Sequence, residues 1–213
     1  MKLFLHQIEA LKQTKERSRV AYYLDMGLGK TFVGSEKMKD LGKHLNIIVC
    51  QKSLISTWME HFEKYYSMDF TVIDATKHDD QFINKSIKAN VSPVVIIINY
   101  DLIFRRSYFQ LYEDFTLMLD ESSVIQNEKA KRSKFILKMK PANVILLSGT
   151  PSSGKYENLW TQIHLLGWGI SEKLYNRQYV NWKRLEGDFP MWVVDKDDPY
   201  KNVDRLKSKL REH

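Results

Sequence analysis

The sequence is poor in the residues that would cross-link or interrupt the chain. Its 213 residues include a single cysteine, Cys50, so no disulfide can form within the chain. Cys50 ends an apolar run and is expected to be a small buried residue rather than a nucleophile or a metal ligand. With 9 glycines and 5 prolines, the chain also shows no low-complexity linker and no evident internal repeat.

Long hydrophobic runs are missing as well. No apolar segment approaches the length that spans a membrane, and the N-terminus turns polar too early for a signal peptide. These absences predict an intracellular, reducing compartment such as the cytoplasm, with no membrane partner.

The composition supports one substantial folded domain. Hydrophobic residues make up 43% of the chain and aromatic residues 12%, which excludes a disordered chain. The formal net charge of +7 suits a polyanionic partner. Basic proteins without such a partner are common, so the charge alone does not identify one.

Apolar strands alternate with amphipathic helices along most of the chain. Strands are expected at residues 20–24, 46–50, 70–73, 94–98, 115–119 and 144–147. Helices are expected at residues 5–17, 54–66 and 80–89, from the glycine loop to residue 41, and from residue 204. The strands are almost continuously apolar, as in strands buried on both faces. The pattern predicts an α/β fold with a mostly parallel central sheet and helices on both faces.

A glycine loop joins the first expected strand to the following helix. It reads Gly27-Leu28-Gly29-Lys30-Thr31, and its glycines would let backbone N–H groups approach phosphates closely. Lys30 would reach the β- and γ-phosphates, and the Thr31 hydroxyl would bind Mg²⁺. The strict phosphate-loop pattern has a further glycine where this chain has Leu24. We nevertheless predict an ATP site here rather than a plain turn, with Gly27, Leu28, Gly29, Lys30 and Thr31 around the phosphates.

A second segment, Gly149-Thr150-Pro151-Ser152-Ser153-Gly154-Lys155, has a similar spacing after an apolar strand. Tyr156 occupies the position where a metal-binding Ser or Thr hydroxyl is needed, and no strand ending in acids follows. We therefore predict no phosphate site there.

Two acids follow the apolar strand at residues 115–119. Asp120 is predicted to hold Mg²⁺ through water, and Glu121 to orient and deprotonate the attacking water. Alone, such a pair is an ordinary N-terminal cap of a helix. Because a parallel sheet brings the carboxyl ends of its strands to one edge, the acids and the phosphate loop could face one nucleotide. The combination predicts Lys30, Asp120 and Glu121 as catalytic residues.

The ordered set of motifs resembles superfamily-two helicases, and most closely the Swi/Snf-type double-stranded DNA translocases, including small phage and bacterial members. In chain order, the similar segments are Leu5-His6-Gln7 and residues 24–31, 49–58, 98–103, 120–127, 147–151 and 157–160. The resemblance implies a RecA-like ATP-binding lobe at residues 1–170 and a helical or irregular extension at residues 171–213. ATP and Mg²⁺ are the implied cofactors and double-stranded DNA is the implied partner. A phage-encoded member would act in the host-cell cytoplasm.

The resemblance also implies roles for polar residues outside the catalytic set. Gln7 would read adenine, Lys52 and Ser53 would contact a DNA backbone, and Ser148 and Thr150 would couple nucleotide state to the DNA side. Each has a plainer alternative. Gln7 could be a polar helix-face residue, the Lys52-Ser53 pair a helix N-cap, and the Ser148–Thr150 segment a simple turn.

Two further features have both a structural and a functional interpretation. Trp58, at a helical face position, is expected in the core rather than as a base-stacking platform. A basic run follows the acids, at Lys129, Lys131, Arg132 and Lys134. Charge runs are usually solvated, but the position of this one favours phosphate contact.

The chain departs from the family pattern at two points. Ser122-Ser123 stand where the family usually has Ala-His or Ser-His after the acids, so coupling could be tuned differently. The family also needs a second RecA-like lobe, which supplies arginines and half of the DNA track and which this chain lacks. We expect a fragment that ends at His213, binds nucleotide weakly and hydrolyses little on its own.

The predicted function is the ATP-binding lobe of an ATP-dependent double-stranded DNA translocase. The alternatives are an RNA-directed helicase lobe, a non-catalytic nucleotide-dependent DNA-binding switch, and a P-loop kinase of small molecules. The Met-Gly-Leu-Gly-Lys-Thr loop and the Trp58 segment argue against the RNA helicase, and the intact Glu121 argues against the switch. No arginine-bearing lid for a kinase is recognisable.

Overall fold

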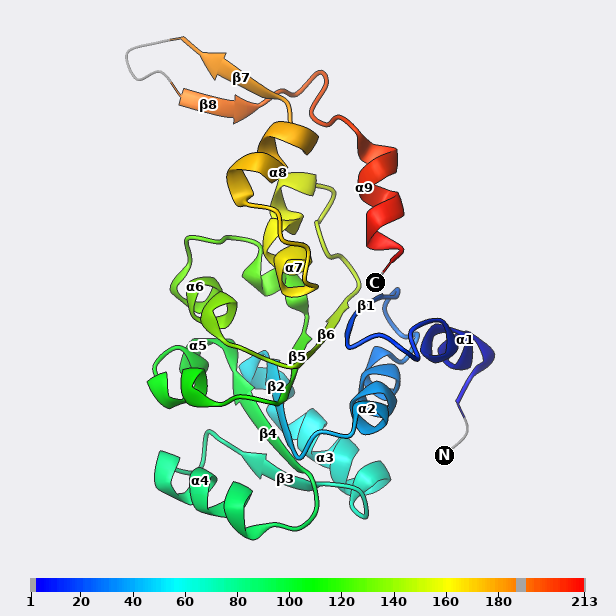
Figure 1. The fold of residues 1–213 in the computed structure, drawn as a ribbon, viewed down its shortest axis with the longest axis vertical. Helices are drawn as coiled ribbons and strands as arrows, with labels where there is room; N and C mark the ends of the chain where they lie inside the picture. Colours follow the sequence, from blue (N-terminus) through cyan, green and yellow to red (C-terminus); the bar gives the residue numbers. More distant parts are fainter. Residues whose placement is uncertain (1–2, 187–190, 213) are drawn as a thin grey trace.

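The computed structural model describes residues 3–186 and 191–212. Its centre is a six-stranded sheet with the order β1-β6-β5-β2-β4-β3, in which all neighbouring strands are parallel (Figure 1). The strands are β1 (Arg19–Tyr23), β2 (Leu45–Cys50), β3 (Thr71–Asp74), β4 (Val94–Asn99), β5 (Thr116–Asp120) and β6 (Asn143–Ser148). The predicted parallel sheet is therefore confirmed.

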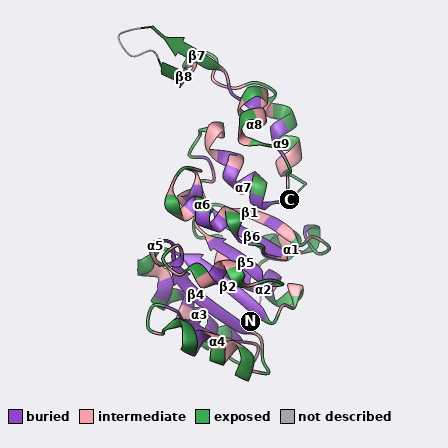
Figure 2. Cartoon of the chain, turned by 60° about the vertical axis from the view of Figure 1, so that its left-hand side comes forward, coloured by how far each residue is buried: buried purple, intermediate pink, exposed green. Residues whose placement is uncertain are grey.

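Helices cover both faces of this sheet (Figure 1). One layer consists of α2 (Lys30–Leu41) and α3 (Ile55–Tyr66), with α1 (Leu5–Gln13) packed beside α2. The other layer consists of α4 (Asp80–Ala89), α5 (Tyr100–Ile103), α6 (Lys131–Lys138) and the end of α7 (Trp160–Leu165). The strands between these layers are the most continuously buried part of the chain (Figure 2).

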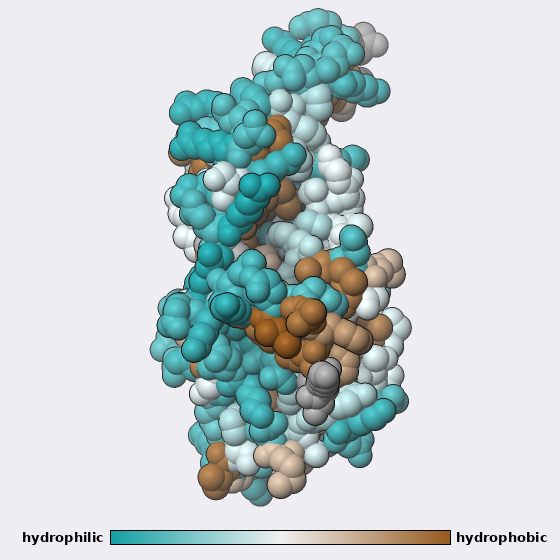
Figure 3. Space-filling view, turned by 90° about the vertical axis from the view of Figure 1, so that its right-hand side faces the viewer, coloured by the Kyte–Doolittle hydropathy of each residue, from teal (hydrophilic) through white to brown (hydrophobic). Residues whose placement is uncertain are grey.

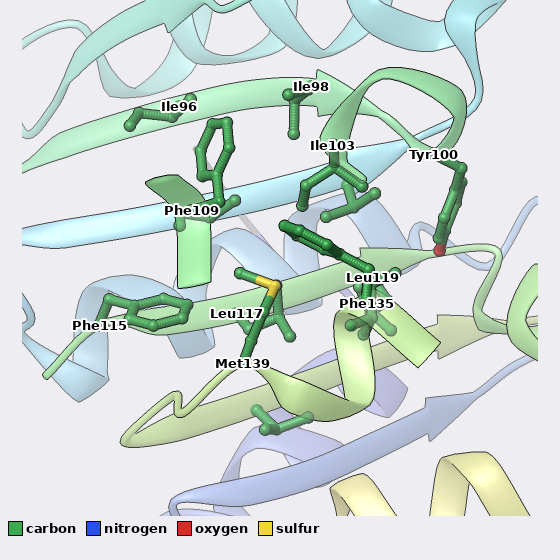
Figure 4. Packing of buried hydrophobic residues seen from close by; sticks show 14 of the residues in the cluster. Ile96, Ile98, Tyr100, Ile103, Phe109, Phe115, Leu117, Leu119, Phe135 and Met139 are labelled. Atoms are coloured by element: carbon green, nitrogen blue, oxygen red, sulfur yellow. The ribbon is translucent and has the colours of Figure 1, made fainter. Parts of the chain in front are cut away.

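Alternate residues of a strand face opposite helix layers. In β4, Val95 and Ile97 pack with α2 and α3, whereas Ile96 and Ile98 pack with the layer that contains α4 to α6. Figure 4 shows this second cluster, in which Phe109 lies close to the β4 side chains. Burial on both faces explains why the strands read as unbroken apolar runs. Cys50, at the end of β2, is fully buried as predicted, and burial raises the pKa of its thiol to about 12.

The first helix is shorter than the sequence pattern predicts. It ends at Gln13 rather than near Arg17: Thr14 is the C-cap, its backbone N–H donates to the carbonyl of Leu11 at 3.3 Å, and its hydroxyl donates to the carbonyl of Ala10 at 2.9 Å. The ammonium of Lys37, fully buried on α2, donates to the carbonyls of Thr14 and Lys15 at 2.8 and 2.9 Å. A long-range contact therefore fixes the end of this helix.

Short helices after β4 and β5 were not predicted. α5 has 4 residues and α6 has 8, and the sequence of α6 is dominated by charge. Neither is long enough to show a clear helical period in the sequence.

The last segment forms a smaller structure beyond the sheet. It contains α8 (Glu172–Tyr179), strands β7 (Trp182–Leu185) and β8 (Met191–Val194), and α9 (Val203–Leu210). Tyr175, Tyr179 and Leu206 are buried there against Leu159 and Ile163. The latter two precede residue 170, so this small core includes residues from both sides of the predicted boundary; the division into lobe and extension remains a prediction.

The antiparallel pair β7–β8 is a correction to the expected helical or irregular extension. Every residue of β7 is exposed, and Trp182 and Trp192 are among the exposed large side chains. A strand without a buried face has no apolar alternation, so no period-two pattern marks β7 in the sequence. No helix in the described part of the chain has the length and hydrophobicity to cross a membrane.

Candidate nucleotide site and adjoining groove

The glycine loop lies between β1 and α2, at the carboxyl edge of the sheet. Gly27 and Gly29 have φ values of 82° and 72°, in the left-handed region that favours glycine. Gly29 is the N-cap of α2, so the free N–H groups of the first helical turn follow the loop directly. The backbone is thus suited to bind an anion.

Lys30 and Thr31 lie in the first turn of α2. The Lys30 ammonium donates to the carbonyls of Leu24 and Asp25 at 2.9 and 3.2 Å, and so closes the loop on itself. A phosphate would offer this ammonium stronger, charged acceptors than the two carbonyls.

Thr31 is linked to α3 through the Ser35 hydroxyl. Its carbonyl accepts a hydrogen bond from Ser35 Oγ at 2.9 Å, and Ser35 Oγ lies 3.0 Å from Nε2 of the buried His61. Because the Ser35 proton goes to Thr31, His61 Nε2 is the donor in the second bond. Burial lowers the pKa of His61 to about 4, so the neutral imidazole supports this turn.

Gln7 contacts the phosphate loop directly. Its side chain is 2% exposed, and Nε2 donates to the carbonyls of Leu28 and Gly29 at 3.2 and 3.4 Å. A Cβ on Gly29 would lie 2.3 Å from this nitrogen, so a larger residue would displace the Gln7 amide and would also have to adopt the left-handed φ of 72°. His6 Nε2 also lies 3.0 Å from the Leu28 carbonyl. Gln7 therefore braces the loop, and its contact with adenine remains a prediction.

Apolar side chains border this side of the site. Figure 3, which faces the α1 side of the molecule, shows hydrophobic surface gathered there. The large exposed apolar residues of the N-terminal segment and of the loop are Phe4, Leu5, Ile8, Met26 and Leu28.

Asp120 ends β5 and is held by two donors. Its Oδ2 accepts from Trp58 Nε1 at 2.8 Å, and its backbone carbonyl accepts from the Tyr100 hydroxyl at 2.9 Å. Burial raises the pKa of Asp120 above its ordinary value, and the nearby positive charge of Lys30 offsets part of this rise. A carboxylate that is costly to ionise without a partner suits a site that receives a cation.

Glu121 is bonded by two serine hydroxyls. Its Oε1 accepts from Ser148 Oγ at 2.6 Å and from Ser123 Oγ at 2.9 Å, and its backbone is left-handed with φ 55°. The Thr150 N–H donates to Ser148 Oγ at 3.1 Å. Ser148 therefore joins Glu121 to the segment predicted to couple the two sides of the protein.

The strand order brings the loop and the acids to one rim. β6 lies between β1 and β5, with Tyr23 paired to Ser148 and Asp120 paired to Leu147. A Cβ on Gly149 would lie 3.7 Å from Lys30 Nζ. The rejected second glycine segment thus begins beside the first one, and it leads into a 3₁₀ turn at Tyr156–Leu159 rather than directly into an α-helix.

The groups at this rim fit Mg²⁺ bound together with phosphates. The predicted ligands, the Thr31 hydroxyl and the Asp120 carboxylate, are the hard oxygen donors that Mg²⁺ prefers. Among residues 3–186 and 191–212, no group of three or more His, Cys, Asp or Glu side chains could form a cage for a metal. Mg²⁺ characteristically takes few protein ligands and completes its shell with water and substrate oxygens.

A groove of about 950 Å³ adjoins the acids on the side of β2 and β4. Its walls come from residues 51–53, 99–101, 123–124 and 126–127, together with Arg132. Lys52 and Ser53 are exposed in this groove, and Arg132 Nη1 lies 3.6 Å from Asp101 Oδ1. Of the predicted basic run, Arg132 thus reaches the groove that also contains Lys52.

Several residues of the site were missed in the sequence. Trp58 is in the core as expected, 2% exposed, but its indole N–H also binds Asp120. The need of a buried indole N–H for an acceptor was the available signal. Ser122, at a position where the family pattern differs, donates to the fully buried Gln162 at 2.7 Å. Gln162 in turn donates to the Pro151 carbonyl at 2.6 Å, which only the fold could reveal.

Comparison with known proteins identifies the family. The model of the SNF2-related domain matches residues 22–211, which is most of the chain. The chain belongs to the SNF2-related domain family. The resemblance to Swi/Snf-type proteins predicted from the motifs is thereby confirmed.

The curated relatives of this chain are distant and much longer. The TATA-binding protein-associated factor BTAF1 of Arabidopsis thaliana is 27% identical over 177 residues, covering 73% of this chain and 8% of that protein. The human SWI/SNF-related matrix-associated actin-dependent regulator of chromatin subfamily A member 1 is 27% identical over 150 residues, covering 67% of this chain and 14% of that protein. This chain therefore spans a small part of these relatives.

Solved structures share the fold. The Sulfolobus solfataricus SWI2/SNF2 ATPase core in complex with dsDNA matches with a TM-score of 0.69 and 24% identity, over 84% of this chain and 39% of that chain. A second structure, described as the Sulfolobus solfataricus SWI2/SNF2 ATPase core domain, matches with a TM-score of 0.67 and 20% identity, over 84% of this chain and 38% of that chain. The RecA-like α/β fold of the SNF2 ATPase core is therefore the fold of this chain.

Proposed function

We propose that this SNF2-related chain is the ATP-binding lobe of an ATP-dependent double-stranded DNA translocase. Lys30 and Thr31 bind the triphosphate and its Mg²⁺, Asp120 holds Mg²⁺, and Glu121 orients and deprotonates the attacking water. Gly27, Leu28 and Gly29 supply the backbone around the phosphates, and Gln7 supports the loop and contacts adenine. Hydrolysis is coupled to DNA through Ser148 and Thr150.

One observation carries this proposal: the Lys30–Thr31 turn and the Asp120–Glu121 tip lie on the same rim of the sheet, with a groove directly beside them. Phosphoryl transfer needs little beyond positioning and charge neutralisation, and these groups provide both. A plain helix cap or turn would not require the phosphate loop, the acids and the Ser148 hydroxyl to meet.

Duplex DNA is the proposed partner. The groove is lined by the exposed Lys52 and Ser53 and by the half-buried Arg132, and the chain has a formal net charge of +7. The Sulfolobus solfataricus core of similar fold is described in complex with dsDNA, and a human relative is a chromatin-remodeling ATPase, INO80. We extend the DNA partner and the ATPase activity of these proteins to this chain as a proposal.

The arrangement implies a second lobe. The matched part of the Sulfolobus solfataricus core is 39% of that chain, so most of that ATPase core lies outside the part that resembles this chain. We propose that a further RecA-like lobe closes on the Lys30 and Glu121 rim and contributes cationic side chains to the transition state.

The test is ATP hydrolysis by this chain and by its longest natural form, each with duplex DNA, with single-stranded RNA and without nucleic acid. Stimulation by duplex DNA is expected, and Asp120→Asn should remove it. Preferential stimulation by RNA would support the RNA-helicase alternative. Nucleotide-dependent DNA binding without hydrolysis in any form would leave the non-catalytic switch as the function.

A further inference from the structure

Asp120 is tied to the groove by the two hydrogen bonds that hold it. The Tyr100 hydroxyl binds its backbone carbonyl at 2.9 Å, and Tyr100 is itself part of the groove wall. Trp58 Nε1 binds its carboxylate at 2.8 Å, and Trp58 lies one turn into α3. That helix follows without a break on the Lys52–Leu54 turn, whose first two residues also line the groove.

Both donors are tightly packed. Trp58 is 2% exposed in the layer between α3 and the sheet, and Tyr100 is 3% exposed at the end of β4 (Figure 4). A packed aromatic ring moves only with the element that bears it, because protein interiors have few voids. A small shift of α3 or of the β4 end would therefore move the donor and, through it, Asp120.

We propose that Trp58 and Tyr100 are positioning residues that make the placement of Asp120 depend on what occupies the groove. This inference rests on the proposed function, because it takes Asp120 as the Mg²⁺ ligand and duplex DNA as the occupant. DNA that contacts the Lys52–Ser53 turn and the β4 end fixes both elements. The two hydrogen bonds then hold Asp120 in the position that binds Mg²⁺ and nucleotide.

The coupling has a thermodynamic signature. If DNA strengthens the binding of Mg²⁺–nucleotide by some factor, Mg²⁺–nucleotide must strengthen the binding of DNA by the same factor. Loss of the two donors should reduce this factor toward one, whereas damage to the fold alone would weaken both ligands without changing their dependence on each other.

Two variants remove the donors. Tyr100→Phe deletes the hydroxyl alone, whereas Trp58→Phe keeps an aromatic ring but deletes the indole N–H together with part of the buried ring volume. Tyr66→Phe is the matched control on α3, because it deletes a hydroxyl that donates to Glu36 Oε1 at 2.8 Å, away from the acids. Tyr112→Phe is a second control, since it removes a hydrogen bond of the same length to Asn84.

The measurement is the affinity of the chain for a fluorescent ATP analogue in Mg²⁺ and in EDTA, with and without a short DNA duplex. In Trp58→Phe, affinity in Mg²⁺ should fall by roughly tenfold, the effect of one charge-assisted hydrogen bond. In Tyr100→Phe the fall should be about fivefold, because the hydroxyl binds a neutral backbone carbonyl. Affinity in EDTA should change little in both. The effect of the duplex should shrink toward none. The two control variants should match the wild type in all four conditions.

The inference is overturned if Trp58→Phe and Tyr100→Phe respond to Mg²⁺ and DNA as Tyr66→Phe does, or if duplex DNA leaves nucleotide affinity unchanged in the wild-type chain. Thermal melting monitors folding, and Tyr100→Phe decides alone if Trp58→Phe is unfolded. Asp120→Asn separates the two proposals. If Asp120→Asn keeps the Mg²⁺ dependence of nucleotide binding, the role proposed for Asp120 as a Mg²⁺ ligand fails. If Asp120→Asn loses this dependence while Trp58→Phe and Tyr100→Phe behave like the wild type, only the positioning role is refuted.

Discussion

The two halves of the carboxyl edge of the sheet differ in how their polar groups are held. On the half formed by β1, β6 and β5, Lys30 is bonded to loop carbonyls and Glu121 to two serines. On the half formed by β2 and β4, Lys52, Ser53 and Asp101 are exposed in an open groove. The first half is pre-organised for a compact ligand, and the second is a surface for an extended polyanion.

The largest effect is expected when the cation of the first half is removed. Lys30→Ala should lower DNA-stimulated ATP hydrolysis by roughly a thousandfold, since the β- and γ-phosphates lose their neutralising charge. DNA affinity, measured by fluorescence anisotropy, should remain as in the wild type because Lys30 does not line the groove. Wild-type turnover in this variant would refute the assignment of the loop.

The contact of His61 with Ser35, which supports the Thr31 turn, should be lost in acid. Burial lowers the pKa of His61 to about 4, against an ordinary 6.5, so the unfolded chain takes up this proton at a higher pH than the folded one. The free energy of unfolding therefore contains the full contribution of the neutral His61 above pH 6.5. This contribution decreases by about 3 kcal/mol as the pH drops toward 4. Denaturant titrations across this range should show the loss.

A matched variant isolates the contribution of His61. His61→Gln keeps a donor for Ser35 but has no titrating group, and its stability should change less between pH 7 and pH 4. An identical pH dependence in the two proteins would assign the acid sensitivity to other groups.

Removal of charge from the second half should lower DNA affinity and leave hydrolysis without DNA unchanged, whereas Lys30→Ala should lower hydrolysis and leave DNA affinity unchanged. Lys52→Ala combined with Arg132→Ala should weaken duplex binding by roughly tenfold at moderate salt, because two phosphate contacts are lost. The slope of log affinity against log salt should decrease by about 1.8. Hydrolysis without DNA should be unaffected. If the affinity and the slope are unchanged, this groove is not the DNA site.

The smallest effect is expected at the junction between the halves. Ser148→Ala deletes the 2.6 Å hydrogen bond to Glu121 Oε1 but leaves the bond from Ser123. Because the bond from Ser123 remains, the kcat should fall only about fivefold, less than for the loss of the sole hydrogen bond to a charged group, with little change in KM for ATP. A KM effect of equal size would place Ser148 in nucleotide binding instead.

Sequence patterns predicted the repeating part of the fold well. The strands of the sheet were recognisable as apolar runs, because burial on both faces leaves no polar residue in β4 before Asn99. The glycine loop was recognisable because left-handed backbone at Gly27 and Gly29 demands glycine. The β7–β8 pair was missed because its exposed residues have no such constraint.

The candidate site was predictable in its charged residues but not in their partners. Lys30, Asp120 and Glu121 belong to local patterns of a few residues that follow a strand. Trp58 and Tyr100 bind Asp120 across 62 and 20 positions of the sequence, so no local spacing relates them. The contact of Gln7 with adenine remains a prediction, and the hydrogen bonds of Gln7 to the phosphate loop were visible only in the structure.

Local patterns in the sequence were sufficient to locate the six strands of the sheet, the longer helices, and the glycines and acids that follow the strands, because these depend on periodicity and backbone freedom within a few residues. Only the tertiary structure decided that β6 lies between β1 and β5, and that Lys30 thereby meets the Asp120–Glu121 tip. Strand order and buried hydrogen-bond partners depend on packing among distant segments, which no local pattern records.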